Sequence, residues 1–424
     1  MQPVVWKISG IIFGLFFSTV LSVQEDEMEL AEKVSQLQQQ LESQEIPQRD
    51  DAEQALIELG PNALDHLLPA EDDSTSDVRD RLGRIRGKLE TMAVTAVSQS
   101  SKVTLKGQMS VAEAIDRIEK QTANKLIVAD REVLEKVIQM DCDKVEFWPA
   151  MNQLLVKSQL QVDRYGGQPG VLNLIAAGDS KPVFPTTVAK IFQLSATRVD
   201  SSLNLGAPKQ DWTSVQIQVR WEPRLRPISV DIPMSTVQAI DEYGDRVPVA
   251  NANEVVYGMV QPEIPELEFH LRLARVDRQV EELKSITAKI NAVLPGRIET
   301  FRFKNLDDQR RGWSQKQAGA MVTFGGIQKN EDLFGVIIEL KIDEEHNALE
   351  SHRGWVFENE VYILDQVGKR QDSVSMETLQ QDNSLVKIQY FFLENPNGDT
   401  LIYKTPAAIV HMPVEFTLTK IPLP

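Results

Sequence analysis

The sequence predicts a multidomain α+β protein with a helical N-terminal segment, a small mixed α/β module and two antiparallel β-sandwich domains. Apolar residues recur at helical spacing up to about residue 98, and short strands alternate with helices over residues 102–177. From residue 183 onward, apolar and polar residues alternate with a period of two. The 424 residues are enough for several domains of about 150 residues each.

The chain is acidic, with 45 Lys and Arg against 62 Asp and Glu and a formal net charge of -17. This charge argues against nucleic acids and anionic membrane surfaces as partners. The single cysteine, Cys142, cannot form an intrachain disulfide. It is in phase with Ile138 and Met140, so we expect a small buried apolar side chain.

Residues 1–22 have the pattern of an export signal, with Lys7 before the apolar run Ile8–Leu21. Cleavage is expected between Ser22 and Val23, which would place the protein in the periplasm or outside the cell. The alternative is an uncleaved membrane anchor, but the run is shorter than the ~20 residues that a spanning helix needs. No later stretch is long and apolar enough to span a membrane.

Residues 23–98 are expected to be helical. One amphipathic helix is indicated by apolar residues at intervals of three and four, namely Leu30, Val34, Leu37 and Leu41. Pro47 is expected to end it. Residues 51–68 and 77–89 then predict an antiparallel helix pair, and the string Leu59-Gly-Pro-Asn-Ala-Leu64 resembles a HEAT-type repeat over about residues 48–90.

Residues 102–177 repeat a pattern of strand, helix and strand. Val103 and Leu105 alternate with polar residues before Gly107 breaks the run, and Ser110 with Glu113 forms a capping box at the start of a helix. About 36 positions later the pattern recurs. Its strands and helix are indicated by these residues: Ile138, Met140 and Cys142; Phe147, Met151, Leu154 and Leu155; Leu160 and Val162; and, after a glycine-rich turn at 166–170, Val171–Ile175.

These two halves, V-T-L-K-G-Q-M-S-V-A-E-A-I-D-R-I from 103 to 118 and F-W-P-A-M-N-Q-L-L-V-K-S-Q-L-Q-V from 147 to 162, resemble the short N-terminal domain of secretins and TonB-dependent receptors. The resemblance implies a β-α-β plus β-α-β-β module and an address in a Gram-negative envelope. The second half departs from the family, because Glu146 stands where a Ser or Thr cap is expected and Pro149 lies in the first helical turn.

After a linker near residues 182–185, four strands show clear alternation of buried and exposed positions. Their apolar residues are Val215 to Trp221, Leu267 to Leu273, Val336 to Ile342 and Val386 to Phe392, each taken at every second position. D-x-x-G turns at 241–246 and 365–370 recur at an offset of about 120, and the segments 298–306 and 414–423 are expected to correspond as well. We therefore expect sandwich domains at 183–306 and 307–424, with Asn395–Asp399 as a hairpin turn.

No catalytic, cofactor-binding or metal-binding residues are predicted. The sequence lacks a G-x-S-x-G elbow, a phosphate-binding loop and an H-E-x-x-H motif. Of the five histidines, only His346 and His352 are close in sequence, and their acidic surroundings favour a solvated loop. Trp221 is in phase with its strand and is expected in the core, whereas Trp212, Trp313 and Trp355 are the candidate aromatic residues for a ligand surface.

These observations favour an exported, non-enzymatic interaction or scaffold protein of the bacterial cell envelope, which binds another envelope or secreted protein through its β modules. One alternative is a carbohydrate-binding or accessory module of polysaccharide degradation, based on the three tryptophans. A TonB- or secretin-linked signalling component is another. A hydrolase with a site between domains would depend only on the many carboxylates.

Overall fold

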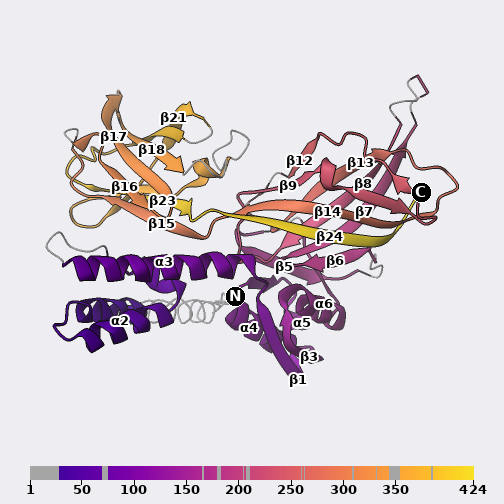
Figure 1. Cartoon of the computed structure of the whole chain (residues 1–424), viewed down its shortest axis with the longest axis horizontal. Helices are drawn as coiled ribbons and strands as arrows, with labels where there is room; N and C mark the ends of the chain where they lie inside the picture. The colour runs from indigo at the N-terminus through magenta and orange to yellow at the C-terminus, as the bar shows by residue number, and fades with distance from the viewer. Residues whose placement is uncertain are drawn as a thin grey trace, which may run out of the picture. The chain divides into compact units, whose positions relative to one another are not determined.

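The computed structural model describes residues 28–424 except 69–74, 165–166, 179–182, 204, 207–210, 259, 262, 308–309, 331, 343–353 and 383–384. Strand accounts for 48% and helix for 25%, which confirms a mixed protein with several antiparallel sheets and a helical N-terminal region (Figure 1). Two compact units are present, Met1–Thr95 and Ala96–Pro424. The predicted export signal, with Ser22 and Val23, lies outside the described residues.

The N-terminal unit is helical, as predicted. Its elements are a helix over residues 28–40, α2 (Ile46–Glu58), the 3-10 helix η1 (Pro61–Asp65) and α3 (Ser76–Ser98). Pro47 lies in the first turn of α2, where a missing N–H costs nothing. The helix expected over 51–68 ends at Glu58, because Gly60 adopts a φ of +80° and Pro61 starts the separate η1 turn.

The expected antiparallel pairing of α2 and α3 is wrong. Arg49 of α2 pairs with Asp77 near the start of α3, and Asp50 and Glu53 pair with Arg81, one turn further along. The contacts therefore advance in the same direction along both helices. The connection through η1 is long enough to return the chain to the start of α2 before α3 begins.

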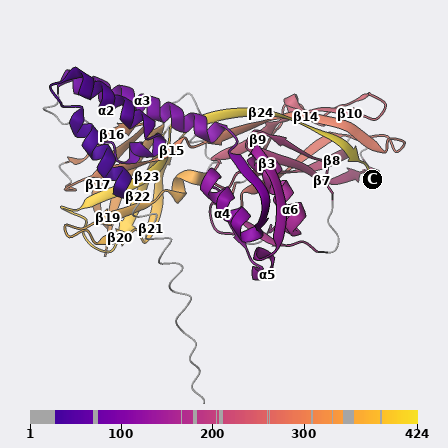
Figure 2. The ribbon, with the colours of Figure 1, turned by 90° about the horizontal axis from the view of Figure 1, so that it is seen from below.

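The module, residues 102–177, contains every helix and strand that the sequence predicts there, and its helices are labelled in Figure 2. Its elements are β1 (Lys102–Ser110), α4 (Val111–Thr122), β2 (Lys125–Val128), α5 (Arg131–Leu134), β3 (Val137–Glu146), α6 (Phe147–Ser158), β4 (Leu160–Val162) and β5 (Val171–Ala176). β1 pairs antiparallel with β3, while β5 lies between β2, which is parallel to it, and β4. One apolar cluster joins α4 and α6 to these strands.

Local details of the module agree with most expectations. The Ser110 hydroxyl accepts a hydrogen bond from the Glu113 N–H (3.1 Å), but the Glu113 side chain pairs with Arg117. Only the first half of the predicted capping box is thus present. Gly107 does not end β1 but lies inside it, with a φ of +101°. Cys142 is buried, as expected, and burial raises the pKa of its thiol.

The first sheet pair consists of two sheets around one apolar core. One sheet has the order β13-β8-β7-β6, and the other has β11-β10-β14-β9-β12 with β24 also paired to β14. The strands are β6 (Thr186–Ala189), β7 (Phe192–Ser202), β8 (Trp212–Trp221), β9 (Ser229–Pro233), β10 (Gln238–Asp241), β11 (Arg246–Val247), β12 (Val255–Gly258), β13 (Glu266–Ala274), β14 (Glu282–Leu294) and β24 (Val410–Pro422). The predicted alternation is confirmed in β13, and in β8 the apolar positions are buried as predicted, including Trp221.

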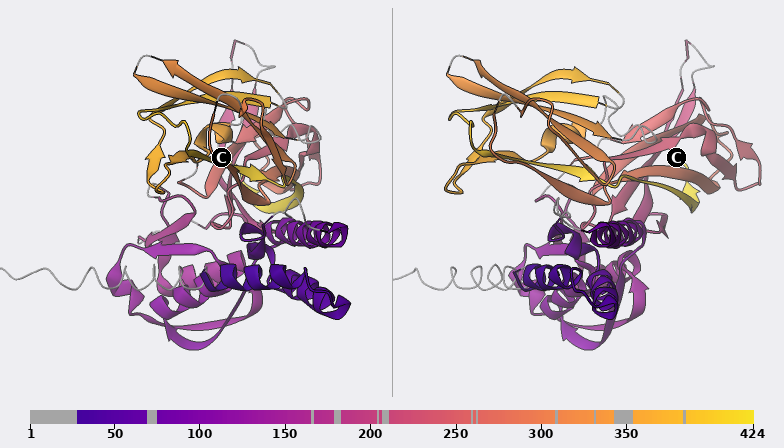
Figure 3. Two further views of the ribbon diagram at one scale, coloured as in Figure 1. Left: turned by 90° about the vertical axis from the view of Figure 1, so that its left-hand side faces the viewer. Right: turned by 60° about the vertical axis from the view of Figure 1, so that its left-hand side comes forward.

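The second sheet pair, drawn in orange to yellow in Figure 3, has its own apolar core. Its sheets have the orders β16-β17-β18-β22-β21 and β15-β23-β19-β20. The strands are β15 (Arg297–Phe303), β16 (Ser314–Gln317), β17 (Ala320–Asn330), β18 (Leu333–Ile342), β19 (Val361–Leu364), β20 (Arg370–Asp372), β21 (Ser375–Gln381), β22 (Leu385–Phe392) and β23 (Thr400–Ala407). The alternations predicted for β18 and β22 bury their apolar residues as expected.

The two sheet pairs share a strand order. β6, β7, β8 and β13 are neighbours in the same sequence as β16, β17, β18 and β22, and β11-β10-β14 corresponds to β20-β19-β23. Both β7 and β17 shift register at one place, between Ala196 and Arg198 and between Phe324 and Gly326. Both predicted D-x-x-G turns close hairpins, with the Asp241 and Asp365 carboxylates each accepting two backbone N–H groups.

Strand pairing does not follow the boundary expected at residue 306. β15 belongs to the second sheet pair, whereas β24 returns to the first and lies along β14 (Figure 1). One antiparallel register continues through both, since Leu294 pairs with Val410 and Arg297 with Ala407. Residues 297–407 thus form an insertion between two paired strands, and β15 and β24 occupy equivalent places beside β23 and β14.

The turn at Asn395–Asp399 is not the expected hairpin. It joins β22 to β23, which belong to different sheets. Gly398 adopts a φ of +84° and the Asp399 N–H donates to the Pro396 carbonyl. The prediction of a tight turn is therefore correct. The turn connects strands of two different sheets, however, and not two paired strands of one sheet.

Candidate functional site

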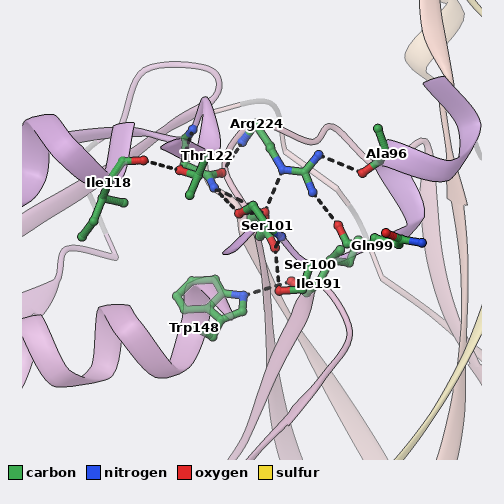
Figure 4. A network of polar contacts seen from close by, with 11 residues as sticks. Ala96, Gln99, Ser100, Ser101, Ile118, Thr122, Trp148, Ile191 and Arg224 are labelled. Carbon is green, nitrogen blue, oxygen red and sulfur yellow. Dashed lines mark hydrogen bonds and ion pairs between the residues drawn. The ribbon is translucent and has the colours of Figure 1, made fainter. Parts of the chain in front are cut away.

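The most extensive polar site joins the module to the first sheet pair, around the fully buried carboxylate of Glu222; Figure 4 labels its partners Ser100, Ser101 and Arg224. Glu222 directly follows β8. Its Oε1 accepts from the Ser100 hydroxyl (3.0 Å) and the Ser101 N–H (2.9 Å), while its Oε2 accepts from the Ser101 hydroxyl (2.7 Å). The carboxylate therefore holds the segment that leads into β1.

Arg224 and Asn124 complete this network. The Arg224 Nε–H donates to Glu222 Oε2 (2.7 Å), and its two terminal nitrogens donate to the carbonyls of Ala96 and Gln99 (Figure 4). Asn124, at the end of α4, donates to Glu222 Oε2 (3.3 Å) and accepts from the Arg224 N–H (2.9 Å). A buried charge needs such compensation.

The Glu222 carboxylate accepts five hydrogen bonds from side-chain and backbone donors. A general acid or base must reach a substrate proton with a free lone pair or its own proton. With both oxygens already occupied by the protein, this carboxylate is arranged to hold chain segments together. The same network explains why a charged side chain can be fully buried here.

A second polar contact lies between the module and the outer face of β8 and β13. Arg164, in the turn after β4, pairs with Glu266 (3.1 Å) and with Glu268. Glu266 also accepts from Arg220 (2.6 Å) and from Gln218 (2.9 Å). Bonds between ionised partners are the stronger class of hydrogen bond, so this cluster ties the module to the edge strand β13 and its neighbour β8.

Helix α6 makes the third contact. The fully buried Trp148 donates its indole N–H to the Ile191 carbonyl (2.9 Å), which is visible in Figure 4. One turn along the helix, Asn152 accepts from Gln193 of β7 (2.9 Å). Trp148 therefore lies at an internal contact, with its apolar ring buried and its polar edge satisfied.

These contacts explain a departure from the sequence prediction for the first sheet pair. The outer face of the β7–β8 sheet was expected to be wet, yet Gln193 and Gln218 are only 7% and 3% exposed. The module covers this face through hydrogen bonds. The period-two pattern predicted correctly which face of the sheet is polar. This polar face contacts the module instead of water.

The three candidate ligand tryptophans are half-buried and are divided between the two sheet pairs. Trp212 starts β8 of the first sheet pair, and the Arg272 guanidinium lies over its ring (5.5 Å). Trp313 and Trp355 both pack against the second core. The ring of Trp313 contacts Phe303 edge-on and has Arg310 over it (5.2 Å). Two of the three rings are therefore already covered on one side by arginine.

Across the described ranges, no group of three or more His, Cys, Asp or Glu side chains is placed to hold a metal ion. His66, His270 and His411 belong to different elements, and His346 and His352 fall outside those ranges. No helix in the described part of the chain is long and apolar enough to cross a membrane.

A candidate surface that the sequence reasoning missed is β21, the edge strand of the second sheet pair. Among the described residues it pairs only with β22. Six of its seven residues are exposed and none is buried. Val374 just before it and Met376 within it are 52% and 44% exposed. A signal was present in the sequence, since 375–381 lacks a clear apolar alternation.

Comparison with known proteins finds no match: no protein-family model, no curated protein and no solved structure is similar to this chain.

Proposed function

We propose that this protein is an exported, non-enzymatic interaction or scaffold protein of the bacterial cell envelope, and that β21 is its principal docking edge. The carrying observation is the exposure of this edge strand on both faces. An edge strand presents unpaired N–H and C=O groups that an extended segment of another protein can pair with. The exposed side chains of Val374 and Met376 would supply apolar contacts to that segment.

The domain organisation supports this proposal. In our interpretation, each sheet pair is a β-sandwich, because residues of both its sheets contribute to one apolar cluster. The module has the element order expected for a short N-terminal domain of secretins and TonB-dependent receptors. Together with the signal pattern of residues 1–22, this order favours the envelope as the location. The sheet to which β21 belongs would hold its free edge in place for a partner.

The module covers β8 and β13, which also favours β21 as the docking edge. The Arg164–Glu266 contact occupies the outer face of the first sheet pair, so that face is already used within the chain. β21, in contrast, carries a single register shift between Thr378 and Gln380. Residues 374–378, which precede this shift, remain regular enough to pair with a second extended strand.

The test is affinity capture from envelope extracts with residues 23–424 as bait. Charged residues at the edge should abolish pairing, so a Val374→Lys/Met376→Lys variant is compared with Val367→Lys. Val367 is 89% exposed but lies in the 365–370 turn, which makes it a matched surface control. We expect a defined partner with the native bait and with V367K, and its loss with V374K/M376K. The same proteins recovered with all three baits would overturn the proposal.

A further inference from the structure

Strand β24 completes a sheet to which none of its neighbours in the sequence belongs. In the second sheet pair, the place beside β23 is filled by β15, which shortly precedes β16. In the first sheet pair, the equivalent place beside β14 is filled by β24, after the whole second sheet pair has intervened. The first sheet pair thus depends on a strand that reaches it from a distant part of the chain.

This strand contributes much to the first core. It forms twelve residue pairs with β14, from Glu282 with Pro422 to Leu294 with Val410. Five of its side chains are buried in the same apolar cluster: Met412, Val414, Phe416, Leu418 and Ile421. Without a strand in this place the core would be open to water, so the place must be filled. The β24 strand of a second copy would offer the same residue pairs and the same buried side chains.

The connection to β24 is short and strained. β23 ends at Ala407 and β24 begins at Val410, which leaves Ala408 and Ile409 as the hinge. Ala408 has a φ of +49°, a left-handed conformation that side chains with a Cβ disfavour. An opened hinge would be free of this strain. Short hinge loops under strain are those that favour exchange of an element between copies.

We propose that β24 is exchanged between two copies of this chain. In the exchanged dimer, β24 of one copy pairs with β14 of the other, and the reverse pairing closes the two-fold symmetry. The partner is a second copy because it offers the same register, the same five buried side chains and the same edge of β14. This inference does not depend on the proposed docking role of β21, which lies at the edge of another sheet.

The test uses Thr287 of β14 and Thr417 of β24, which lie directly opposite each other with hydroxyl oxygens 2.9 Å apart. Two full chains with different tags, both carrying Cys142→Ala, are co-expressed, one with Thr287→Cys and the other with Thr417→Cys. After mild oxidation, exchange should yield a disulfide-linked dimer that carries both tags. The matched control replaces Thr417→Cys by Ser375→Cys in β21 and should yield none.

A single chain with both Thr287→Cys and Thr417→Cys serves as the positive control, because it should close an intrachain disulfide if the pair is well placed. If that disulfide forms but the co-expressed chains never become linked, the proposal is wrong. A dimer in light scattering without this linkage would also overturn it.

The hinge offers an independent measurement. Ala408→Gly removes the penalty of the left-handed conformation from the closed chain, so the dimer association constant should fall several-fold. Ala408→Val should raise it, since a β-branched residue tolerates positive φ least. Equal association constants for A408G, A408V and the native chain, measured by sedimentation across a concentration series, would contradict a hinge-controlled exchange.

Discussion

The two sheet pairs share a strand order, a register shift in β7 and β17 and a D-x-x-G hairpin, but they differ in what surrounds them. The first is covered on an outer face by the module and completed by the distant β24. The second is completed by its neighbour β15 and leaves β21 uncovered among the described residues. The same framework can therefore be an internal support or an available surface, depending on its edges.

The largest effect is expected from Glu222→Ala, which tests whether the first sheet pair is held to the module. Removing one partner of a buried ion pair leaves the Arg224 charge and several donors without compensation, which costs about 3–5 kcal/mol. The free energy of unfolding is measured by urea denaturation. Glu360→Ala, which removes an exposed ion pair with Lys404 and Arg370 on the second sheet pair, should cost less than about 1 kcal/mol.

If Glu222→Ala costs no more than Glu360→Ala, the network around Glu222 does not hold the module. Limited proteolysis provides a second measurement. The turn that contains Arg164 should become cleavable in E222A and stay protected in E360A.

Alkaline pH should affect the stability of the two cores differently. The second core contains Tyr390 and Tyr403, while the first core cluster contains no tyrosine among the described residues. Burial raises the pKa of Tyr403 to about 12 and also raises the pKa of Tyr390. Below pH 10 this contribution to stability is fully present, and it is lost as the pH rises from 10 to 12, because the unfolded tyrosine releases its proton first.

For Tyr403 the loss across this window is about 3 kcal/mol. Urea denaturation at pH 8 and pH 11 measures the first half of this loss, about 1.4 kcal/mol. A Tyr390→Phe/Tyr403→Phe variant is the control and should lose much less stability over the same interval. An equal pH dependence in both proteins would assign the alkaline transition to other groups.

Because both sheet pairs contain the same D-x-x-G hairpin, replacing its glycine should cost the same stability in each. Gly244 and Gly368 have φ values of +92° and +86°, so Gly244→Ala and Gly368→Ala should each destabilise the protein by about 1–2 kcal/mol. Gly87→Ala in α3 is the control, because a Cβ there meets no atom within 4 Å and alanine favours a helix by about 1 kcal/mol. Thermal unfolding of the three variants measures these changes. A clear difference between G244A and G368A would show that the two turns are not equivalent.

The smallest effect concerns the two core tyrosines. The Tyr403 hydroxyl accepts from Asn359 (2.8 Å), while the buried Tyr390 hydroxyl makes no well-formed hydrogen bond to a described residue and has the Tyr403 hydroxyl as a polar neighbour. Tyr390→Phe should therefore be neutral or stabilise by up to about 1 kcal/mol, whereas Tyr403→Phe should destabilise by about 1 kcal/mol. Urea denaturation at pH 7 tests the order; a larger loss in Y390F would reveal a partner for its hydroxyl.

Sequence reasoning predicted those elements whose signal is local. The period-two runs in β8, β13, β18 and β22, the helices of the module and the hairpins at Asp241 and Asp365 each depend on residues a few positions apart. The burial of Cys142 and Trp221 follows from their phase in such runs. The three candidate tryptophans were found by residue type alone, and nothing in their spacing predicted the arginines over Trp212 and Trp313.

What the sequence by itself determined is which residues form helices and strands and which face of each is apolar, because backbone geometry repeats within a few residues. Only the tertiary structure decided that β24 lies beside β14, that the module covers a polar sheet face and that β21 is left as an exposed edge. Any apolar strand face can pack on any complementary face. The choice among partners is made by the free energy of the whole assembled core, to which residues more than a hundred positions apart contribute together.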